Sequence, residues 1–327
     1  MPEATNKRIT GIGSALVDVL INETDQFLQG LEKAKGGMTL VEDHEIESIL
    51  ARTSQSPIIV PGGAACNTII GVGNLGGDAR FIGRRGDDTY GKRFESQILS
   101  CHVEPELSIS PDSPTGKVLS VITPDAQRSM FTFLGASTEL SPAGITPALF
   151  KDTAISVIEG YLLFNPDLMM ASIKAAKAAG SLIALDLASF EVVNASKTIL
   201  LDIVKEYVDI LIANEDEAKA YTGFTDEISA MEILSRDVTY AVLKVGKRGS
   251  FVSFEDKITQ IDPVSGKDPK DTTGAGDLWA AGFLFGIANG FSIKKSGQLG
   301  SACGYEVCQV MGAQIPETAW QRIRALI

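Results

Sequence analysis

The sequence predicts an α/β fold in which helices flank a mainly parallel central sheet, with a small β lid attached. Short β-rich apolar runs alternate with helix-like segments along most of the 327 residues. This alternation is typical of βαβ units. The length allows one large or two ordinary domains. Because no interdomain linker is visible, we expect a single α/β domain over residues 1–327.

The expected elements follow from these runs in chain order. We expect strands at 8–13, 58–60, 80–82, 154–158, 182–186, 210–213 and 241–245. Helical patterns occupy 64–70, 166–179, 197–208, 215–221 and 316–327.

Two segments break the alternation. Residues 17–41 are polar and irregular, and residues 108–137 have the pattern of extended chain with turns. The stretch 123–127 is typical of a hairpin turn. We predict that 17–41 and 108–137 together form the lid.

Composition limits the possible partners. The net charge of −12 would repel nucleic acid backbones and anionic membranes. The first ten residues lack the apolar core of a signal peptide, and the longest apolar stretch, 278–288, is too short to cross a bilayer. We therefore expect a cytoplasmic protein that acts on a small molecule. With two histidines and no C-x-x-C pair, a zinc site is hard to build.

The first glycine-rich segment, 71–76, fits the dinucleotide pattern G-x-G-x-x-G. Such a site requires a strand directly before the glycines. The preceding residues have a helical pattern instead, so we favour a helix end, where glycine serves as a C-cap. An NAD-dependent oxidoreductase is the alternative.

The second segment, 86–93, is similar to a phosphate-binding P-loop. However, Arg93 stands where serine or threonine would hold magnesium, and Asp87 and Asp88 would repel phosphates. We predict a polar turn that caps a helix starting near Thr89.

The third segment, 271–277, reads Asp-Thr-Thr-Gly-Ala-Gly-Asp and precedes an apolar run. A turn of small residues that opens a helix offers free N–H groups and a helix dipole to an anion. Asp277 would stand at that anion site, where a carboxylate can take the proton of an attacking hydroxyl. The alternative is that Asp277 only caps the helix.

This heptapeptide resembles the C-terminal signature of the ribokinase/PfkB carbohydrate kinase family, which includes adenosine kinases. The resemblance extends along nearly the whole chain. It implies a ribokinase-like fold and ATP-dependent phosphorylation of a hydroxyl on a small sugar or nucleoside. It also implies that Asp277 is the catalytic base and that the amides of Gly274, Ala275 and Gly276 hold the γ-phosphoryl group.

Two further motifs resemble the family's substrate site. The run 61–68 is similar to its N-terminal Gly-Gly…Asn signature, which implies that the sugar lies against Gly62 and Gly63 and that Asn67 bonds its hydroxyls. Asp18 follows the first expected strand and would bind substrate hydroxyls. Read alone, the glycine pair is an ordinary turn and Asp18 an ordinary loop residue.

The nucleotide site is implied by two other motifs. Asn214 and Glu217 match the family's Asn-x-x-Glu, so Asn214 would contact ATP phosphates and Glu217 would order Mg²⁺ through water. The alternative is an acidic helix N-terminus. The run 243–250 resembles the Gly-x-x-Gly turn along the nucleotide, although a plain hairpin turn is the alternative. The residues expected there are Lys244, Gly246, Gly249 and Thr273.

A monovalent cation such as K⁺ is a further implication of the resemblance. Asp271, Thr273 and Gly312 match positions that supply oxygens to such a cation in some members.

One run departs from the family pattern. The sequence at 186–190 lacks the asparagine and arginine of the frequent Asp-x-Asn-x-Arg run, which argues against a plain sugar kinase and favours the adenosine-kinase-like branch. The run 127–137 resembles the substrate-covering strand of that branch. Arg128 and Phe133 would bind the substrate, and aromatic residues there would either stack on a base or fill the lid core.

A catalytically inactive nucleotide-binding regulator on the same fold is the non-enzyme alternative. It would require damage at Asp277 or at the anion site, and both are intact. Exposed β edges of the lid would allow pairing between copies, so we expect a monomer or a homodimer.

Overall fold

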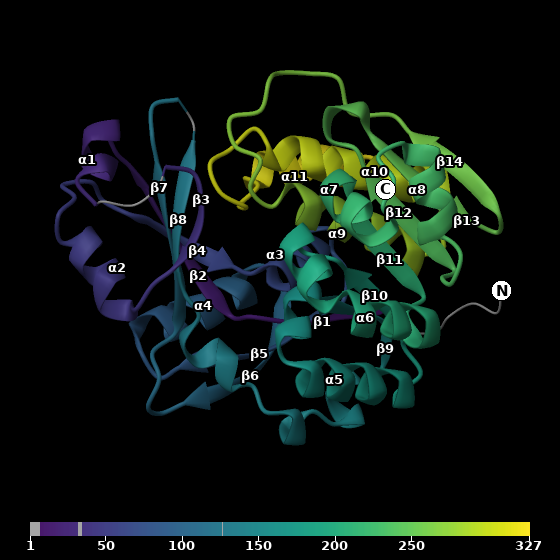
Figure 1. The fold of residues 1–327 in the computed structure, drawn as a ribbon, viewed down its shortest axis with the longest axis horizontal. Helices are drawn as coiled ribbons and strands as arrows, with labels where there is room; N and C mark the ends of the chain where they lie inside the picture. The colour runs from purple at the N-terminus through teal and green to yellow at the C-terminus, as the bar shows by residue number, and fades with distance from the viewer. Residues whose placement is uncertain (1–6, 32–34, 126) are drawn as a thin grey trace.

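A computed structural model describes residues 7–31, 35–125 and 127–327 of the chain. Over these ranges the strands form two sheets, a nine-stranded one and a five-stranded one (Figure 1). The predicted lid segments include residues 32–34 and 126, which lie outside the described residues.

The larger sheet is parallel from β12 to β6 and ends in the antiparallel strands β13 and β14. This confirms the predicted mainly parallel sheet. In spatial order its strands are β14 (Lys257–Ile261), β13 (Ser250–Phe254), β12 (Tyr240–Lys244), β11 (Ile210–Asn214), β10 (Leu182–Asp186), β9 (Thr153–Glu159), β1 (Arg8–Ile12), β5 (Ala79–Gly86) and β6 (Val103–Ser110).

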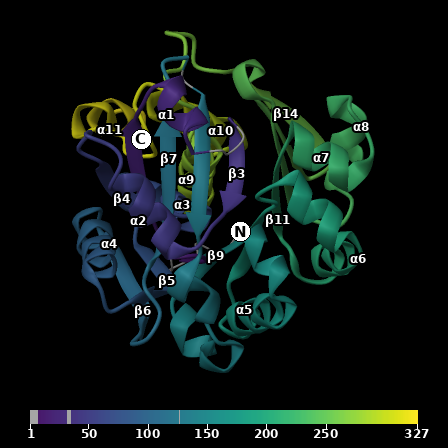
Figure 2. The ribbon, with the colours of Figure 1, turned by 60° about the vertical axis from the view of Figure 1, so that its left-hand side comes forward.

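Helices cover both faces of this sheet (Figures 1 and 2). Successive strand residues point to opposite faces, so Val157 and Ile158 of β9 enter two different cores. The first core is covered by α3 (Ala64–Asn74), α4 (Thr89–Ser100), α9 (Ala275–Ala288), α10 (Ile293–Val307) and α11 (Glu317–Arg324). The second is covered by α5 (Pro166–Ala178), α6 (Phe190–Tyr207), α7 (Glu215–Thr222) and α8 (Glu227–Leu234).

The five-stranded sheet stands beside this body, at the left of Figure 1. Its strands, in spatial order, are β3 (Gly37–Leu40), β8 (Arg128–Phe133), β7 (Gly116–Ile122), β2 (Leu16–Asn22) and β4 (Ile58–Gly62). Two short helices, α1 (Asp25–Gln29) and α2 (Asp43–Leu50), accompany it. Four of the strands come from, or overlap, the segments 17–41 and 108–137. Among the described residues, none of the helices is long and apolar enough to cross a bilayer.

One predicted element was wrong, and one was too short. Residues 17–41 are not irregular throughout, because β2 begins at Leu16 and buries Val17, Val19 and Ile21 around a single aspartate that disguises the run. Helix α6 begins at Phe190 and has a kink at Ser196, so the predicted helix at 197–208 forms its second part. The first part was missed, and it begins where the Ser189 hydroxyl accepts a hydrogen bond from the third residue of the helix.

The first two glycine-rich segments are structural. Residues 71–76 lie in and just after α3, so helical residues rather than a strand directly precede these glycines, and the dinucleotide site is excluded at this position. Asp88 caps α4 by accepting a hydrogen bond from the amide of Gly91 at 2.7 Å, which confirms the predicted turn.

Gly71 allows α3 and α9 to pack closely. A β-carbon at Gly71 would lie 2.5 Å from the β-carbon of Ala281 and 2.8 Å from a methyl group of Leu278. Real β-carbons keep larger distances, so only glycine fits this crossing without moving a helix.

We predict that Gly71→Ala lowers the free energy of unfolding by about 1 kcal/mol. Overpacking costs about 1–3 kcal/mol, which outweighs the gain of up to about 1 kcal/mol in helix propensity. Urea unfolding measures the change. Gly144→Ala is the control, because nothing lies near its β-carbon. A Gly71→Ala protein as stable as the wild type would contradict the close packing.

Candidate active site

Four neighbouring parallel strands of the large sheet end in polar residues. β9, β10, β11 and β12 end at Glu159, Asp186, Asn214 and Lys244. In the sheet register Glu159 lies beside Asp186, and Asn214 lies beside Lys244. In open α/β sheets, ligands bind outside the carboxyl ends of the strands. This edge is therefore the place to look for a binding site.

The predicted anion site lies at the start of α9. Gly274 precedes the helix with φ +70°, where glycine is favoured, and a β-carbon there would crowd Ala313. The helix begins at Ala275, and Asp277 lies in its first turn, where N–H groups have no partner within the helix. The structure thus brings Gly274, Ala275, Gly276 and Asp277 together at one positive helix end.

Asp277 is held by α3. The amide nitrogen of Asn67 donates a hydrogen bond of 2.9 Å to its carboxylate, and the Thr68 hydroxyl donates one of 3.1 Å to its carbonyl oxygen. Burial raises the pKa of Asp277 to about 7. The Asn67 hydrogen bond and Lys244 oppose this rise, whereas the charges of Asp186 and Glu159 add to it. A carboxylate with such a pKa is a base suited to neutral pH.

The other end of the Asn67 side chain has no partner. Asn67 is 5% exposed, and its amide oxygen accepts no hydrogen bond from the described residues. A buried acceptor without a donor is costly unless a ligand supplies one. A small cavity of about 10 Å³, close to the size of one water, lies between Thr68, Asp186 and Asp277.

Asp18 lies on β2 beside the glycine pair. A β-carbon at Gly62 would lie 2.5 Å from the Asp18 carboxyl carbon, and Gly63 has φ +98°. Burial raises the pKa of Asp18 to about 6, although the positive charge of Arg128 lowers it. The structure therefore places Asp18, Gly62, Gly63 and Arg128 in one neighbourhood.

Asp271 connects three parts of the chain. It accepts hydrogen bonds from the Thr273 amide at 3.0 Å, the Thr273 hydroxyl at 2.6 Å and the Gly312 amide at 2.8 Å. Arg128 of β8 donates to it at 3.4 Å. Burial would raise the pKa of Asp271, but these hydrogen bonds outweigh burial and lower it. Gly312 thus contributes its N–H, rather than its oxygen, to this cluster.

Asn214 and Glu217 form a capping box at the start of α7. The Asn214 amide and side-chain nitrogens donate to the Glu217 carboxylate at 2.8 and 2.7 Å, and the Glu217 amide donates back to the Asn214 side chain at 2.9 Å. Glu217 is 2% exposed, unlike an ordinary solvated cap. Burial and the charge of Asp186 raise its pKa to about 7, and Lys244 opposes the rise.

Lys244 brings a buried positive charge to the start of α9. Its ammonium nitrogen lies 3.0 Å from the Asp186 carboxylate, and a β-carbon at Gly276 would lie 2.9 Å from it. Burial lowers the pKa of Lys244, but Asp186, Glu217 and Asp277 outweigh burial and raise it. After Lys244 the chain turns at Gly246 (φ +56°) and Gly249 (φ +95°) into the antiparallel β13, as a hairpin turn would.

Sequence reasoning did not find Glu159, Asp186 as a site residue, or the aromatic residues near them. Tyr161, Phe164 and Phe190 are large exposed side chains at the carboxyl ends of β9 and β10. Burial raises the pKa of Tyr161 to about 12, and the negative charges of Glu159, Glu217 and Asp277 add to this rise. The predicted aromatic residue, Phe133, is half-buried and packs against the core. Glu159 and Asp186 could have been found from the sequence, because each is a polar residue at the end of an apolar strand.

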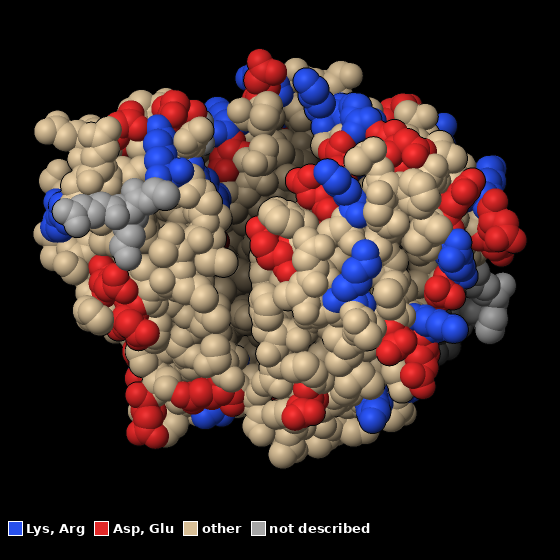
Figure 3. All heavy atoms as spheres, in the orientation of Figure 1, with Lys and Arg blue, Asp and Glu red and all other residues tan. Residues whose placement is uncertain are grey.

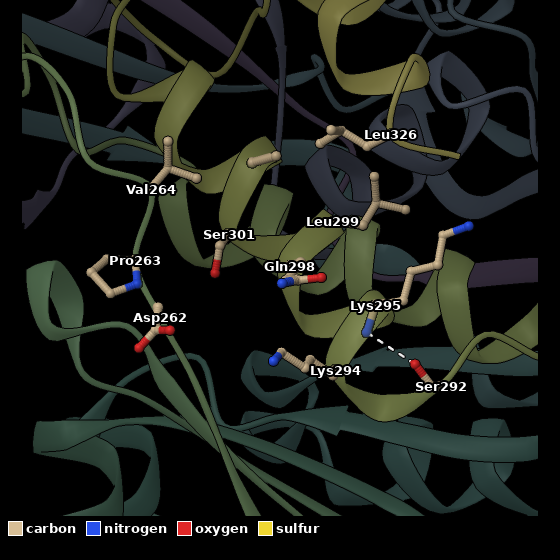
Figure 4. Close-up of a pocket in the computed structure, with 11 residues that line it drawn as sticks. Asp262, Pro263, Val264, Ser292, Lys294, Lys295, Gln298, Leu299, Ser301 and Leu326 are labelled. Atoms are coloured by element: carbon tan, nitrogen blue, oxygen red, sulfur yellow. Dashed lines mark hydrogen bonds between the residues drawn. The ribbon is translucent and has the colours of Figure 1, made fainter.

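Two hollows are open to ligands. A groove separates the five-stranded sheet from the rest of the molecule (Figure 3). A pocket of about 590 Å³ lies between the chain after β14 and the outer face of α10, with Val264 and Pro263 opposite Ser301 and Gln298 (Figure 4). Ser301 belongs to the half of α10 that packs on the start of α9, since a β-carbon at Gly304 would touch Ala275.

Several known proteins are similar to this chain in sequence and in fold. The model of the pfkB family carbohydrate kinases matches residues 39–320. A nucleoside kinase from Methanocaldococcus jannaschii is 26% identical over 80% of this chain and 83% of its own length. The adenosine kinase of Saccharomyces cerevisiae is 25% identical over 93% of this chain and 96% of its own.

Solved structures agree. An adenosine kinase from Sinorhizobium meliloti is 31% identical and superposes with a TM-score of 0.87 over 97% of this chain and 99% of its own. A probable sugar kinase from Rhizobium etli CFN 42 is 28% identical and superposes with a TM-score of 0.88 over 99% of this chain and 100% of its own. The chain therefore belongs to the pfkB family of carbohydrate kinases, with their ribokinase-like α/β fold and phosphotransferase activity.

Proposed function

We propose that this kinase transfers the γ-phosphoryl group of ATP to a hydroxyl of a small sugar or nucleoside, with Asp277 as the catalytic base. The observation that carries the proposal is the pair Asn67–Asp277. A half-buried carboxylate with a pKa of about 7 lies at a helix N-terminus, and the asparagine that holds it has an amide oxygen with no hydrogen-bond partner among the described residues. A hydroxyl bound there would meet an acceptor, a base and an anion site together.

The acceptor substrate, whose hydroxyl receives the phosphoryl group, would lie between the two sheets. Gly62 and Gly63 lie directly before α3, which carries Asn67, and the Asp18 carboxylate lies against Gly62, so substrate hydroxyls would have hydrogen-bond acceptors on two sides. Asp277 accepts the hydroxyl proton while the oxygen attacks the phosphorus in line. Closure of the groove would exclude water and limit hydrolysis of ATP.

The phosphates of ATP would lie at the start of α9. The amides of Gly274, Ala275 and Gly276 at the start of this helix would bind them, although the Ala275 amide donates to the Thr272 carbonyl oxygen at 3.2 Å in the present structure. Lys244 would supply a positive charge beside Gly276. The turn at Gly246 and Gly249, together with Asn214 and Thr273, would line the rest of the path. The 590 Å³ pocket on α10 has the size that the nucleoside part of ATP requires.

Residues suited to magnesium are present. The buried Glu217 carboxylate lies close enough to Lys244 and Asp186 for their charges to act on its pKa. Carboxylates hold Mg²⁺ together with its waters, and the bound ion neutralises charge on the transferring phosphoryl group. K⁺ at Asp271, Thr273 and Gly312 stays a prediction, which assays with and without K⁺ test.

A nucleoside is the first acceptor to test. The exposed aromatic residues Tyr161, Phe164 and Phe190 at the end of the sheet offer flat apolar surface to a base, whereas a sugar needs mainly polar partners. Several relatives and solved neighbours are nucleoside or adenosine kinases. ATP consumption with adenosine, inosine, guanosine, ribose, fructose and fructose phosphates decides between the classes. No turnover with any of them would favour the inactive regulator.

Asp277→Asn should lower kcat about 1000-fold, because general-base catalysis contributes about 10²–10⁴. The fold and the affinity for ATP should be kept, since asparagine has the same shape. Steady-state kinetics, circular dichroism and direct ATP binding measure the three properties. Asp78→Asn, at the opposite end of the large sheet, is the control. Near-normal kcat in folded Asp277→Asn protein would rule out the base.

The pH dependence of kcat/KM should show a limb near pH 7, with activity rising as Asp277 loses its proton. Lys244→Gln should move this limb to higher pH, because the positive charge of Lys244 lowers the pKa of Asp277. It should also raise the KM for ATP about tenfold through loss of a charge-assisted contact. Lys174→Gln, exposed on α5 and outside the proposed site, is the control. An unmoved limb would contradict the charge coupling.

A further inference from the structure

Helix α3 begins without a cap of its own. Its N-cap is Gly63, which has no side chain to accept a hydrogen bond. Glycine is required at this position, because φ is +98° and a β-carbon would collide with the Ser14 carbonyl oxygen. The free N–H groups of the first turn must therefore find an acceptor elsewhere.

Glu159, the last residue of β9, provides that acceptor from another part of the chain. One carboxylate oxygen accepts a hydrogen bond of 3.1 Å from the amide of Ala65, the second residue of α3. The other accepts one of 3.4 Å from the amide of Ser14, in the link between β1 and β2. A β-carbon at Gly13 would collide with this carboxylate, so glycine there makes room for it.

The position of Glu159 is costly. It is 3% exposed, and burial raises its pKa despite the two amide hydrogen bonds. No lysine or arginine among the described residues forms an ion pair with it. A buried charge of this kind needs a compensating role, and the positive end of α3 supplies part of the compensation.

The two amides belong to the two elements that carry the proposed acceptor ligands. Ala65 is two residues before Asn67, and Ser14 is two residues before the start of β2, which carries Asp18. The ladder between β2 and β4 ends at the pair Leu16 and Gly62, so the Glu159 carboxylate links the two segments just beyond the ladder, at Ser14 and Ala65.

We propose that Glu159 is a positioning residue, which fixes the acceptor-binding segments 13–18 and 62–67 relative to each other by bridging the amides of Ser14 and Ala65. This inference rests on the proposed function, since it assigns Asn67 and Asp18 to the acceptor. Glu159 acts through these residues and does not itself take part in the proton transfer.

Glu159→Gln tests the proposal. Glutamine has nearly the same shape as glutamate. However, the NH2 end of its amide cannot accept a hydrogen bond, so it cannot replace both carboxylate oxygens as acceptors for the two N–H groups. We expect faster hydrogen exchange in segments 11–18 and 61–68, and a KM about tenfold higher for the acceptor that the wild type phosphorylates best. The KM for ATP should stay within about twofold. Glu159→Asp, which keeps the charge but is too short to bridge both amides, should recover only part of the affinity.

Asp209→Asn is the matched control. Asp209 also accepts a backbone hydrogen bond, from Ile183 at 2.7 Å, but it precedes β11 at the opposite end of the sheet. It should lower the melting temperature without a selective change in the acceptor KM. If Glu159→Gln raises both KM values together, as a general loss of stability would, the proposal is overturned.

Hydrogen exchange separates this proposal from the proposed function. If the wild type phosphorylates no acceptor, the proposed function fails, yet exchange in segments 11–18 and 61–68 still reports on the bridge. Unchanged exchange in Glu159→Gln overturns the positioning role in either case, and faster exchange confined to the two segments supports it.

Discussion

The contact between α3 and α9 is the constraint on which the rest of the site depends. Asn67 and Asp277 are 210 positions apart in the chain, yet they share a hydrogen bond because Gly71 lets the two helices approach closely. Helix α3 carries the proposed acceptor ligand, and α9 carries the anion site and the proposed base. In the proposed mechanism, the distance between hydroxyl and phosphoryl group would therefore be set by the packing of two helices, which is far stiffer than a loop.

The site concentrates negative charge that folding alone would not favour. Asp18, Glu159 and Glu217 are buried and Asp277 is half-buried, and burial raises the pKa of each. The folded chain therefore retains protons that the unfolded chain loses above about pH 4. The resulting stabilisation is complete at low pH and disappears as pH rises through the folded-state pKa values of about 6 for Asp18 and about 7 for Glu217 and Asp277. At neutral pH these carboxylates oppose folding, which is expected of a functional cluster.

Much of the fold could be predicted from the sequence, because strands such as β10 and helices such as α5 are bounded by clear apolar runs and turn residues. The hydrophobic pattern failed to predict elements whose formation depends on tertiary contacts or on a capping residue. A single aspartate concealed β2, and no periodicity shows that Ser189 starts α6 early. Within the site, the turn at 271–277 was recognisable because its chemistry is local. Glu159 and Asp186 were missed, because a carboxylate at a strand end gains meaning only from the neighbours that the strand order places beside it.

The hydrogen bond between Arg128 and Asp271 has a thermodynamic meaning beyond its modest strength. It joins β8 of the five-stranded sheet to the turn that opens α9, so a single contact spans the two halves of the groove. A shift of β8 caused by a bound acceptor substrate would therefore also move the turn at Asp271, where the phosphates of ATP are proposed to bind. By reciprocity, the factor by which a bound acceptor alters the affinity for ATP equals the factor by which ATP alters the affinity for the acceptor. Any coupling between the two binding equilibria that passes through this arginine would therefore act equally in both directions.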